Sequence, residues 1–246
     1  MKKLLLLLPF LFMSLVSKAQ FLNTGGDIDQ NRVNFGFLLG IDRSGFIITK
    51  QSNFRLPDSN PYTSDTLYAV KPIGSTGFSL GLLTNLKLTN TLDFRFTPRF
   101  SFISRQMEFQ YNKKSADLNR VVGKEVESTL LELPLLLKLK SARQQDVRLY
   151  VIGGIKFCTD IRSKKKKGDD ALFEPGDDRK LVKIDNNFFA VEAGLGADIY
   201  FEYFKFSPEL KLSRSMANVL KQDNNVFSQP LTGLFAEALH FTMYFE

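Results

Sequence analysis

The chain has 246 residues and a formal net charge of +7 at neutral pH. This excess is mild, so we do not expect nucleic acid as a partner. Cys158 is the single cysteine, which excludes an intrachain disulfide. One cysteine and one histidine do not make a usual metal site, and the sequence therefore predicts neither a metal nor another cofactor.

The N-terminus has the pattern of a secretory signal peptide over residues 1–19. Lys2 and Lys3 precede an apolar run over residues 4–16, and small residues stand at positions 17 and 19. A retained membrane anchor is the alternative, but the run is shorter than the roughly 20 residues that a spanning helix needs. We expect one mature domain over residues 20–246. Loss of three lysines leaves 30 of the 33 basic residues against 26 acidic ones, a charge of +4.

The mature chain alternates apolar and polar residues over eight stretches. Successive side chains of a strand point to opposite faces, so each stretch has one apolar face and one polar face. Charged residues occupy strand interiors, which suits a closed sheet with lipid outside and a polar lumen inside. In the clearest stretch the apolar row is Phe94, Phe96, Pro98, Phe100 and Phe102, and the polar row is Asp93, Arg95, Thr97, Arg99 and Ser101.

The spacing of these stretches predicts an all-β, eight-stranded, antiparallel outer-membrane β-barrel. Connections after the second, fourth and sixth strands are short, whereas the others are long, which is the rhythm of such barrels. The strands are expected at 33–42, 77–88, 91–111, 129–140, 147–161, 188–201 and 204–213, with an eighth near the C-terminus. The long connections are expected at 49–73, 112–128, 162–187 and 214–234.

The inward rows carry charges of both signs, and the interior of an eight-stranded barrel is about filled by its own side chains. We therefore expect a polar plug and not an open channel. The predicted lumen ion-pair network consists of Arg95, Arg99, Glu132, Lys138, Glu192, Lys205, Glu209 and Lys211.

Three local features fit this pattern less simply. Pro98 and Pro134 fall inside strands, where each removes a ladder hydrogen bond and suggests a bulge. Glu237 falls on an outward row, so it lies at a rim or marks a shift of register.

Three sets of residues suggest a catalytic or binding function in addition to the barrel. A lipid-cleaving barrel needs a Ser–His pair that faces the bilayer, whereas His240 faces the lumen by parity with Phe241. The inward glutamates allow an acidic catalytic cluster, but nearby cations favour structural ion pairs. The third set is a basic run in the third long connection, and it suits contact with lipopolysaccharide phosphates or an acidic partner, or else a solvated loop. This run is Lys164, Lys165, Lys166 and Lys167.

Four short segments resemble strands of the PorT-like outer-membrane barrels. They are ELPLLLK at 132–138, YVIGG at 150–154, GLGAD at 194–198 and FSPELK at 206–211. The resemblance covers essentially the whole mature chain, in order. It implies an outer-membrane barrel and, as in the member that gives the family its name, a role in the type IX secretion system, which exports gliding adhesins and proteinases with C-terminal signals.

The resemblance carries no catalytic residue to this chain. We therefore expect a non-enzymatic component of type IX secretion, which contacts outer-membrane lipid, lipopolysaccharide and other secretion components. The alternative is an OmpA-like structural or adhesive surface barrel without a secretion role. A lipid-modifying barrel enzyme is a third hypothesis, which the position of His240 disfavours.

Overall fold

The computed structural model describes residues 31–52, 66–112, 119–161, 182–222 and 227–246. The predicted signal peptide and the basic run at 164–167 lie outside these residues. Within them, no helix is long and apolar enough to span a membrane. The strands are β1 Val33–Lys50, β2 Thr66–Ile73, β3 Ser75–Lys87, β4 Leu92–Phe96, β5 Arg99–Asn112, β6 Asn119–Lys140, β7 Val147–Asp160, β8 Asn187–Tyr200, β9 Lys205–Ser215 and β10 Leu231–Phe245.

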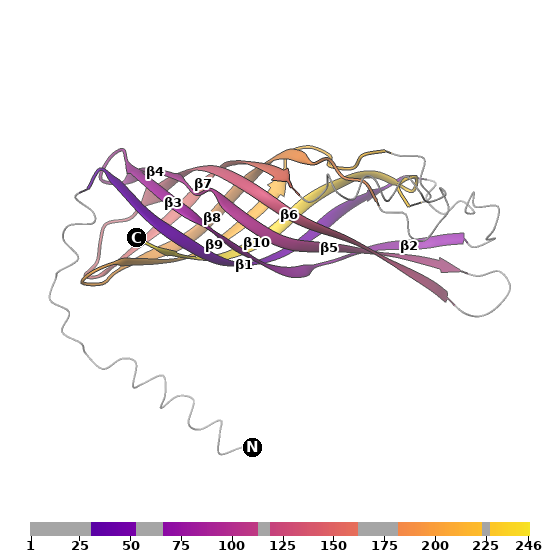
Figure 1. The fold of residues 1–246 in the computed structure, drawn as a ribbon, viewed down its shortest axis with the longest axis horizontal. Helices are drawn as coiled ribbons and strands as arrows, with labels where there is room; N and C mark the ends of the chain where they lie inside the picture. Colours follow the sequence, from indigo (N-terminus) through magenta and orange to yellow (C-terminus); the bar gives the residue numbers. More distant parts are fainter. Residues whose placement is uncertain (1–30, 53–65, 113–118, 162–181, 223–226) are drawn as a thin grey trace, which may run out of the picture.

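The strands close into one antiparallel barrel (Figure 1). From β6 to β10 each strand pairs with the next in the chain. Both β4 and β5 pair with β3 on one side and with β6 on the other, and β2 pairs with β5. The pairing of β1 with both β10 and β3 completes the ring. Only Gly74 separates β2 from β3, and only residues 97–98 separate β4 from β5. Counting each of these two pairs as one strand reduces ten elements to eight. The predicted eight-stranded antiparallel barrel is confirmed.

The bulges expected at the two prolines are absent. β4 and β5 keep the same register against β6 on either side of Pro98, and β6 keeps its register against β7 through Pro134. Residues 97–98 face residues 133–134 across the sheet, so the two lost donors lie in one place and the ladder continues around them. The bulge expectation was wrong because the pleat can continue past a missing donor.

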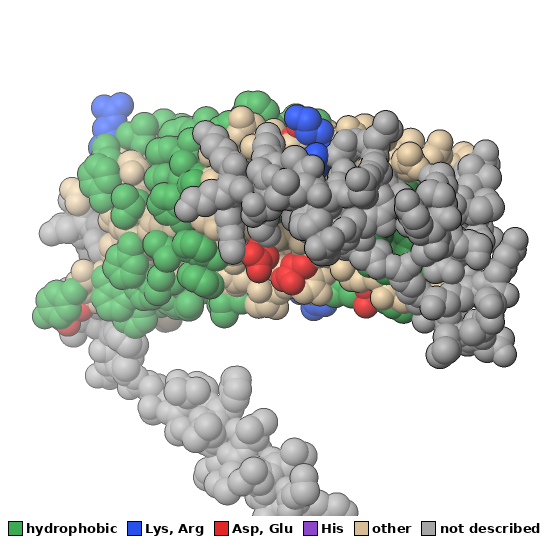
Figure 2. Space-filling model, turned by 45° about the vertical axis from the view of Figure 1, so that its right-hand side comes forward, with side chains coloured by type: hydrophobic (Ala, Val, Ile, Leu, Met, Phe, Trp, Pro, Cys, Tyr) green, Lys and Arg blue, Asp and Glu red, His purple; other side chains and the backbone are tan. Residues whose placement is uncertain are grey.

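The wall has an apolar outer band at the end where the short connections lie, which we call the turn end. On β1 the outward row from Val33 to Ile41 is exposed and wholly apolar. Nine residues extend about 27 Å along a strand, or about 20 Å along the axis of a barrel tilted by roughly 40°. Figure 2 shows hydrophobic side chains gathered over this part of the wall.

Above this band, toward what we call the loop end, the two faces exchange character. Outward positions become polar, with exposed Arg43, Glu125, Arg214 and Glu237. Inward positions become apolar and form the main hydrophobic core. We call this core the apolar plug; its largest fully buried members are Phe46, Met107, Phe109 and Leu130.

This exchange of faces explains where the predicted strand limits were wrong. Residues 66–73 and 119–128 were expected in long connections, but they form β2 and the first part of β6. Their inward side chains, including Leu67, Val70 and Val126, pack in or against the apolar plug. A strand that buries its apolar face inside and exposes its polar face does not match the lipid-facing pattern used to find strands.

Glu237 does lie on the outward face, as its parity predicted, and it is exposed. Its register against Gly45 and Arg214 is regular. It therefore stands just above the apolar band, and no shift of register is needed to explain it.

Candidate functional site: the lumen ion-pair network

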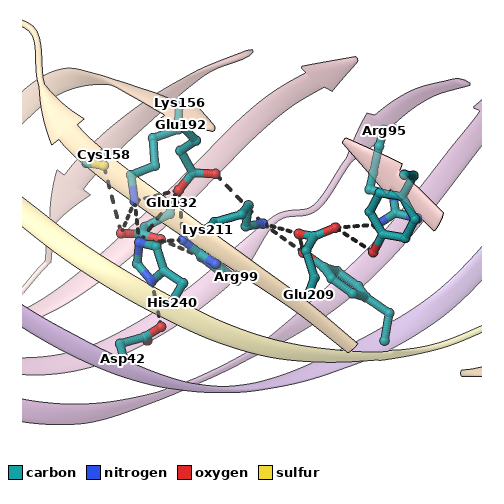
Figure 3. Close-up of polar contacts among 12 residues, drawn as sticks. Asp42, Arg95, Arg99, Glu132, Lys156, Cys158, Glu192, Glu209, Lys211 and His240 are labelled. Carbon is teal, nitrogen blue, oxygen red and sulfur yellow. Dashed lines mark hydrogen bonds and ion pairs between the residues drawn. The ribbon is translucent and has the colours of Figure 1, made fainter. Parts of the chain in front are cut away.

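The lumen inside the apolar band holds a continuous set of buried charges. All eight residues predicted for the network lie there, and each makes an ion pair (Figure 3 draws most of the central ones). The cations in these contacts are Arg95, Arg99, Lys138, Lys140, Lys156, Lys205 and Lys211. The carboxylates are Asp42, Asp93, Glu132, Glu192, Asp198, Glu209 and Glu246.

Glu209 on β9 is the centre of the first cluster. Its Oε2 accepts hydrogen bonds from Arg95 Nη1 at 3.0 Å and from the Tyr150 hydroxyl at 2.8 Å. Its Oε1 accepts from the Tyr244 hydroxyl at 2.9 Å and lies 2.8 Å from Lys211 Nζ. The Arg95 guanidinium also lies over the Tyr244 ring, 4.8 Å from its centroid. Each carboxylate oxygen of Glu209 thus has two protein donors, and neither oxygen needs a water molecule.

The second cluster lies nearer the loop end and joins two cations to two carboxylates. Arg99 contacts Glu132 at 2.5 Å and Glu192 at 3.0 Å. Lys156 contacts the same two carboxylates, at 3.0 and 2.9 Å. Lys211 Nζ lies 3.8 Å from Glu192 and so connects this cluster to the one around Glu209. Charges without water need such partners, because an unpaired one costs several kcal/mol.

His240 is fixed in one tautomer by its neighbours. Its Nε2 lies 3.2 Å from both Arg99 Nη2 and Lys156 Nζ, and these groups only donate. Nε2 must therefore accept, and Nδ1–H donates to Asp42 Oδ1 at 2.6 Å. The side chain is buried in the lumen, as its parity predicted. The lone pair that a general base would use is already engaged.

The same cluster contains a possible metal-ligand group that the sequence did not suggest. Single ligand atoms of Glu132, Glu192 and His240 lie within 4.8 Å of one another. However, Lys156 Nζ lies within 3.2 Å of Glu132 Oε1, Glu192 Oε1 and His240 Nε2. The ammonium group occupies the position that an ion would take, so the residues present do not fit a bound metal.

The charges near the turn end form separate pairs. Lys138 Nζ donates to both oxygens of Asp198 at 2.7 and 2.6 Å, and the Ser207 hydroxyl donates to the same carboxylate. Lys205 pairs with Glu246.

Lys140 and the two tyrosines of the first cluster were not selected from the sequence. Lys140 lies 2.7 Å from Asp93. Lys140 lies two positions from Lys138, Tyr150 two from Ile152 and Tyr244 two from Thr242. This shared parity was the signal that could have placed the three side chains in the lumen.

The network and the apolar plug together fill the lumen. Between them, Arg105 lies over the Phe46 ring at 5.4 Å, and a cavity of about 10 Å³ borders Arg105, Glu132 and His240. That volume holds about one water molecule. In the described part of the chain the lumen is therefore a packed interior.

A closed antiparallel barrel with an apolar outer band and a polar interior is the architecture of integral outer-membrane proteins. The family described as "Outer membrane protein beta-barrel domain" matches residues 18–221. The chain belongs to this family, and its place is the outer membrane. The family is broader than the PorT-like group, so membership of that narrower group stays a prediction. A comparison with curated proteins gives no significant match.

The solved structures similar to this chain include an outer membrane protein, an attachment protein and a β-barrel domain. OprG from Pseudomonas aeruginosa is 12% identical, with 87% of this chain and 90% of that chain covered and a TM-score of 0.38. Ail from Yersinia pestis, solved with the heparin analogue sucrose octasulfate, is 10% identical, with 87% and 99% covered and a TM-score of 0.35. The N-terminal barrel of P. aeruginosa OprF is 12% identical, with 84% and 96% covered and a TM-score of 0.26.

Proposed function

We propose that this protein is a non-enzymatic component of type IX protein secretion that acts by contact with other proteins. The observation that supports action by contact, and not transport through a pore, is the filled lumen. Two linked ion-pair clusters occupy its membrane half, and the apolar plug occupies its loop half. A barrel of eight strands is too narrow to pass a folded protein, and the described side chains fill the lumen of this one. Its surfaces are what it offers to partners.

The chemistry of the lumen supports the non-enzymatic part. His240 has both ring nitrogens engaged, by Asp42 and by two cations. The candidate acidic cluster of Glu132, Glu192 and Glu209 is neutralised by four cations. Among the described residues these side chains are buried, so a substrate would have to displace the packing around them.

The secretion part rests on the resemblance of four strand segments to the PorT-like barrels. The partners that follow from it are other components of the secretion system, together with outer-membrane lipid and lipopolysaccharide. Turns at the turn end, such as residues 88–91, are available to periplasmic partners. The strand ends at the loop end are available to exported proteins.

The test is a clean deletion in the native host, scored by export of proteins that carry type IX C-terminal signals. We expect cargo to accumulate in the periplasm and a plasmid copy to restore export. A rescue copy with Glu209→Gln, which keeps the outer surfaces, should restore export wherever it folds. Normal export in the deletion strain would refute the secretion role.

A structural or adhesive surface barrel is the second candidate, and one observation favours it. The strands β5 and β6 continue for about ten residues beyond the apolar band and carry exposed polar side chains there, including Glu125. Such a wall is suited to contacts outside the cell. Replacing the loop-end connections should abolish adhesion but spare secretion, whereas variants at residues 88–91 and 141–146 should do the reverse.

A further inference from the structure

Arg105 is a buried cation that lies between the ion-pair network and the apolar plug. It belongs to the inward row of β5 and is only 3% exposed, and its guanidinium lies over the Phe46 ring at 5.4 Å. Among the described residues no carboxylate pairs with it, and its Nε and Nη1 atoms have no hydrogen-bond partner. Arg95 and Arg99, by contrast, both pair with carboxylates.

The charge of Arg105 cannot be removed by titration. A guanidinium stays protonated at any pH that a protein tolerates. A buried charge without a partner is costly, and contact with one aromatic ring returns only a small part of that cost. A negative charge beside Arg105 would therefore stabilise the folded barrel.

The small cavity described above borders Arg105. Its volume of about 10 Å³ admits one occupant of about the size of a water molecule. Ser101 also borders it, and the hydroxyl of this residue has no hydrogen-bond partner among the described residues. Ile103, Phe188 and Ala236 supply apolar walls. The cavity thus offers hydrogen-bond donors, a positive charge and partly apolar walls to a single small occupant.

The other titratable groups at the cavity are already engaged. Glu132 has a cation on each of its carboxylate oxygens. Lys156 and His240 make the contacts described for the second cluster. Glu237 also borders the cavity, but its side chain lies on the outward face of the wall. Arg105 is therefore the lumen charge at this cavity that the described residues leave unbalanced.

We propose that this cavity binds one halide ion, which is chloride under physiological conditions. The Arg105 guanidinium supplies the charge and two donors, and the Ser101 hydroxyl donates as well. Sulfate, phosphate and carboxylate ligands are too large for the cavity. A water molecule fits the volume, but it brings no charge to balance the guanidinium. The site lies inside the barrel, so it goes beyond the proposed secretion role and does not depend on it.

The first measurement is X-ray diffraction from crystals of the full chain grown in sodium bromide, because bromide replaces chloride and scatters anomalously. We expect an anomalous peak beside Arg105 in the wild type and none at that place in Arg105→Met. A wild-type map without this peak would overturn the proposal and assign the cavity to water.

The second measurement is thermal unfolding in detergent micelles, followed by circular dichroism, as chloride replaces gluconate at constant ionic strength. Gluconate is too large for the cavity. A ligand that binds only the folded state raises its melting temperature, so the wild type should melt several degrees higher in chloride. Arg105→Met should show no such dependence. Ser101→Ala should raise the chloride concentration of half-maximal stabilisation about fivefold, because one hydrogen bond to the ion is lost.

Lys71→Gln on β2 is the matched control, since it removes an exposed charge outside the cavity. It should keep the full dependence on chloride. Equal melting of the wild type in chloride and gluconate would refute the site, and so would a chloride effect that Arg105→Met retains, because the ion would then bind elsewhere. If Arg105→Met does not fold, the wild-type bromide map and the Ser101→Ala titration decide.

Discussion

The strongest test of the lumen network is the replacement of Glu209 by glutamine. This change keeps the size of the side chain but removes the charge that Arg95 and Lys211 share, at 3.0 and 2.8 Å. Both cations are essentially without solvent exposure, so water does not replace the lost partner. Removing one member of a buried pair costs about 3–5 kcal/mol. We expect the free energy of unfolding of Glu209→Gln to fall by that amount, a large part of the roughly 5–15 kcal/mol of a typical domain.

The assay is equilibrium unfolding in urea with the protein folded into lipid vesicles. The chain has no tryptophan, so circular dichroism is the suitable signal. Glu125→Gln is the matched control, since it removes an exposed carboxylate from the outer wall, and it should change the free energy of unfolding by no more than about 0.5 kcal/mol. The double variant Glu209→Gln/Lys211→Met should recover at least about 1 kcal/mol of the loss, because it also removes an uncompensated cation.

The reasoning fails if Glu209→Gln is as stable as the control. It also fails if the double variant loses the sum of the two single losses, because strict additivity would mean that the two side chains do not interact. In either case the contacts around Glu209 would be a consequence of packing and would not contribute to stability.

Three further predictions use other parts of the barrel. Leu137→Arg on the outward face of the apolar band should lower stability by about 2–4 kcal/mol, whereas Gln106→Arg, on the outward face of β5 beyond the band, should change it by less than about 0.5 kcal/mol; urea unfolding in vesicles compares them. The purified barrel should carry no ion current in a planar bilayer, and steady single-channel steps would contradict the packed lumen. Lys156→Ala should allow Zn²⁺ to raise the thermal stability of the barrel, because Glu132, Glu192 and His240 then lack the ammonium between them; identical melting with and without Zn²⁺ would contradict this.

The membrane half of the fold was predictable because side chains that face lipid must be apolar, whereas those that face the lumen can be polar. Every outward position from Val33 to Ile41 is apolar, and every charged neighbour of Phe94 and Phe100 is inward. The same parity places Arg99 and Glu209 in the lumen without knowledge of their partners. In the loop half this pattern is reversed, since the apolar residues lie inside the barrel and the polar ones outside. The segment Glu125-Val126-Glu127 alternates as clearly as any lipid-facing row, but with the opposite sense.

The identity of the pairs was not predictable, because it depends on the stagger between strands. Glu132 and Lys156 come from neighbouring strands β6 and β7, but Arg95 and Glu209 meet across the lumen from β4 and β9. Parity gives the side of the wall on which a residue lies, and not its height or its position around the axis. The tautomer of His240 could not be predicted either, because it depends on two donors, Arg99 and Lys156, that lie on other strands.

The two halves of the lumen resist water in different ways, and this decides which half closes the barrel. Water that entered the network could solvate Arg99 or Glu192 as it displaced their partners, so part of the cost of opening would be returned. Water that entered the apolar plug would meet few such groups, mainly Arg105 and Lys124 over the rings of Phe46 and Phe227. Exposing a buried side chain such as Phe46 or Phe109 costs about 1.5–3 kcal/mol, and the plug holds many of them.

The apolar plug is therefore the seal, and the network is the filling of the membrane half. A route through the lumen would need the plug to leave its place. Most members of the plug come from the strands of the wall, with Phe46 on β1, Met107 and Phe109 on β5 and Leu234 on β10. The connections before β8 and between β9 and β10 supply the others, which are Val182, Ile184, Val219, Leu220 and Phe227. Movement of these connections alone would leave the strand-borne part of the plug in place, so opening the lumen would also require the barrel wall to rearrange at the loop end. This is why the function is best sought on the outer surfaces and at the two ends of the barrel.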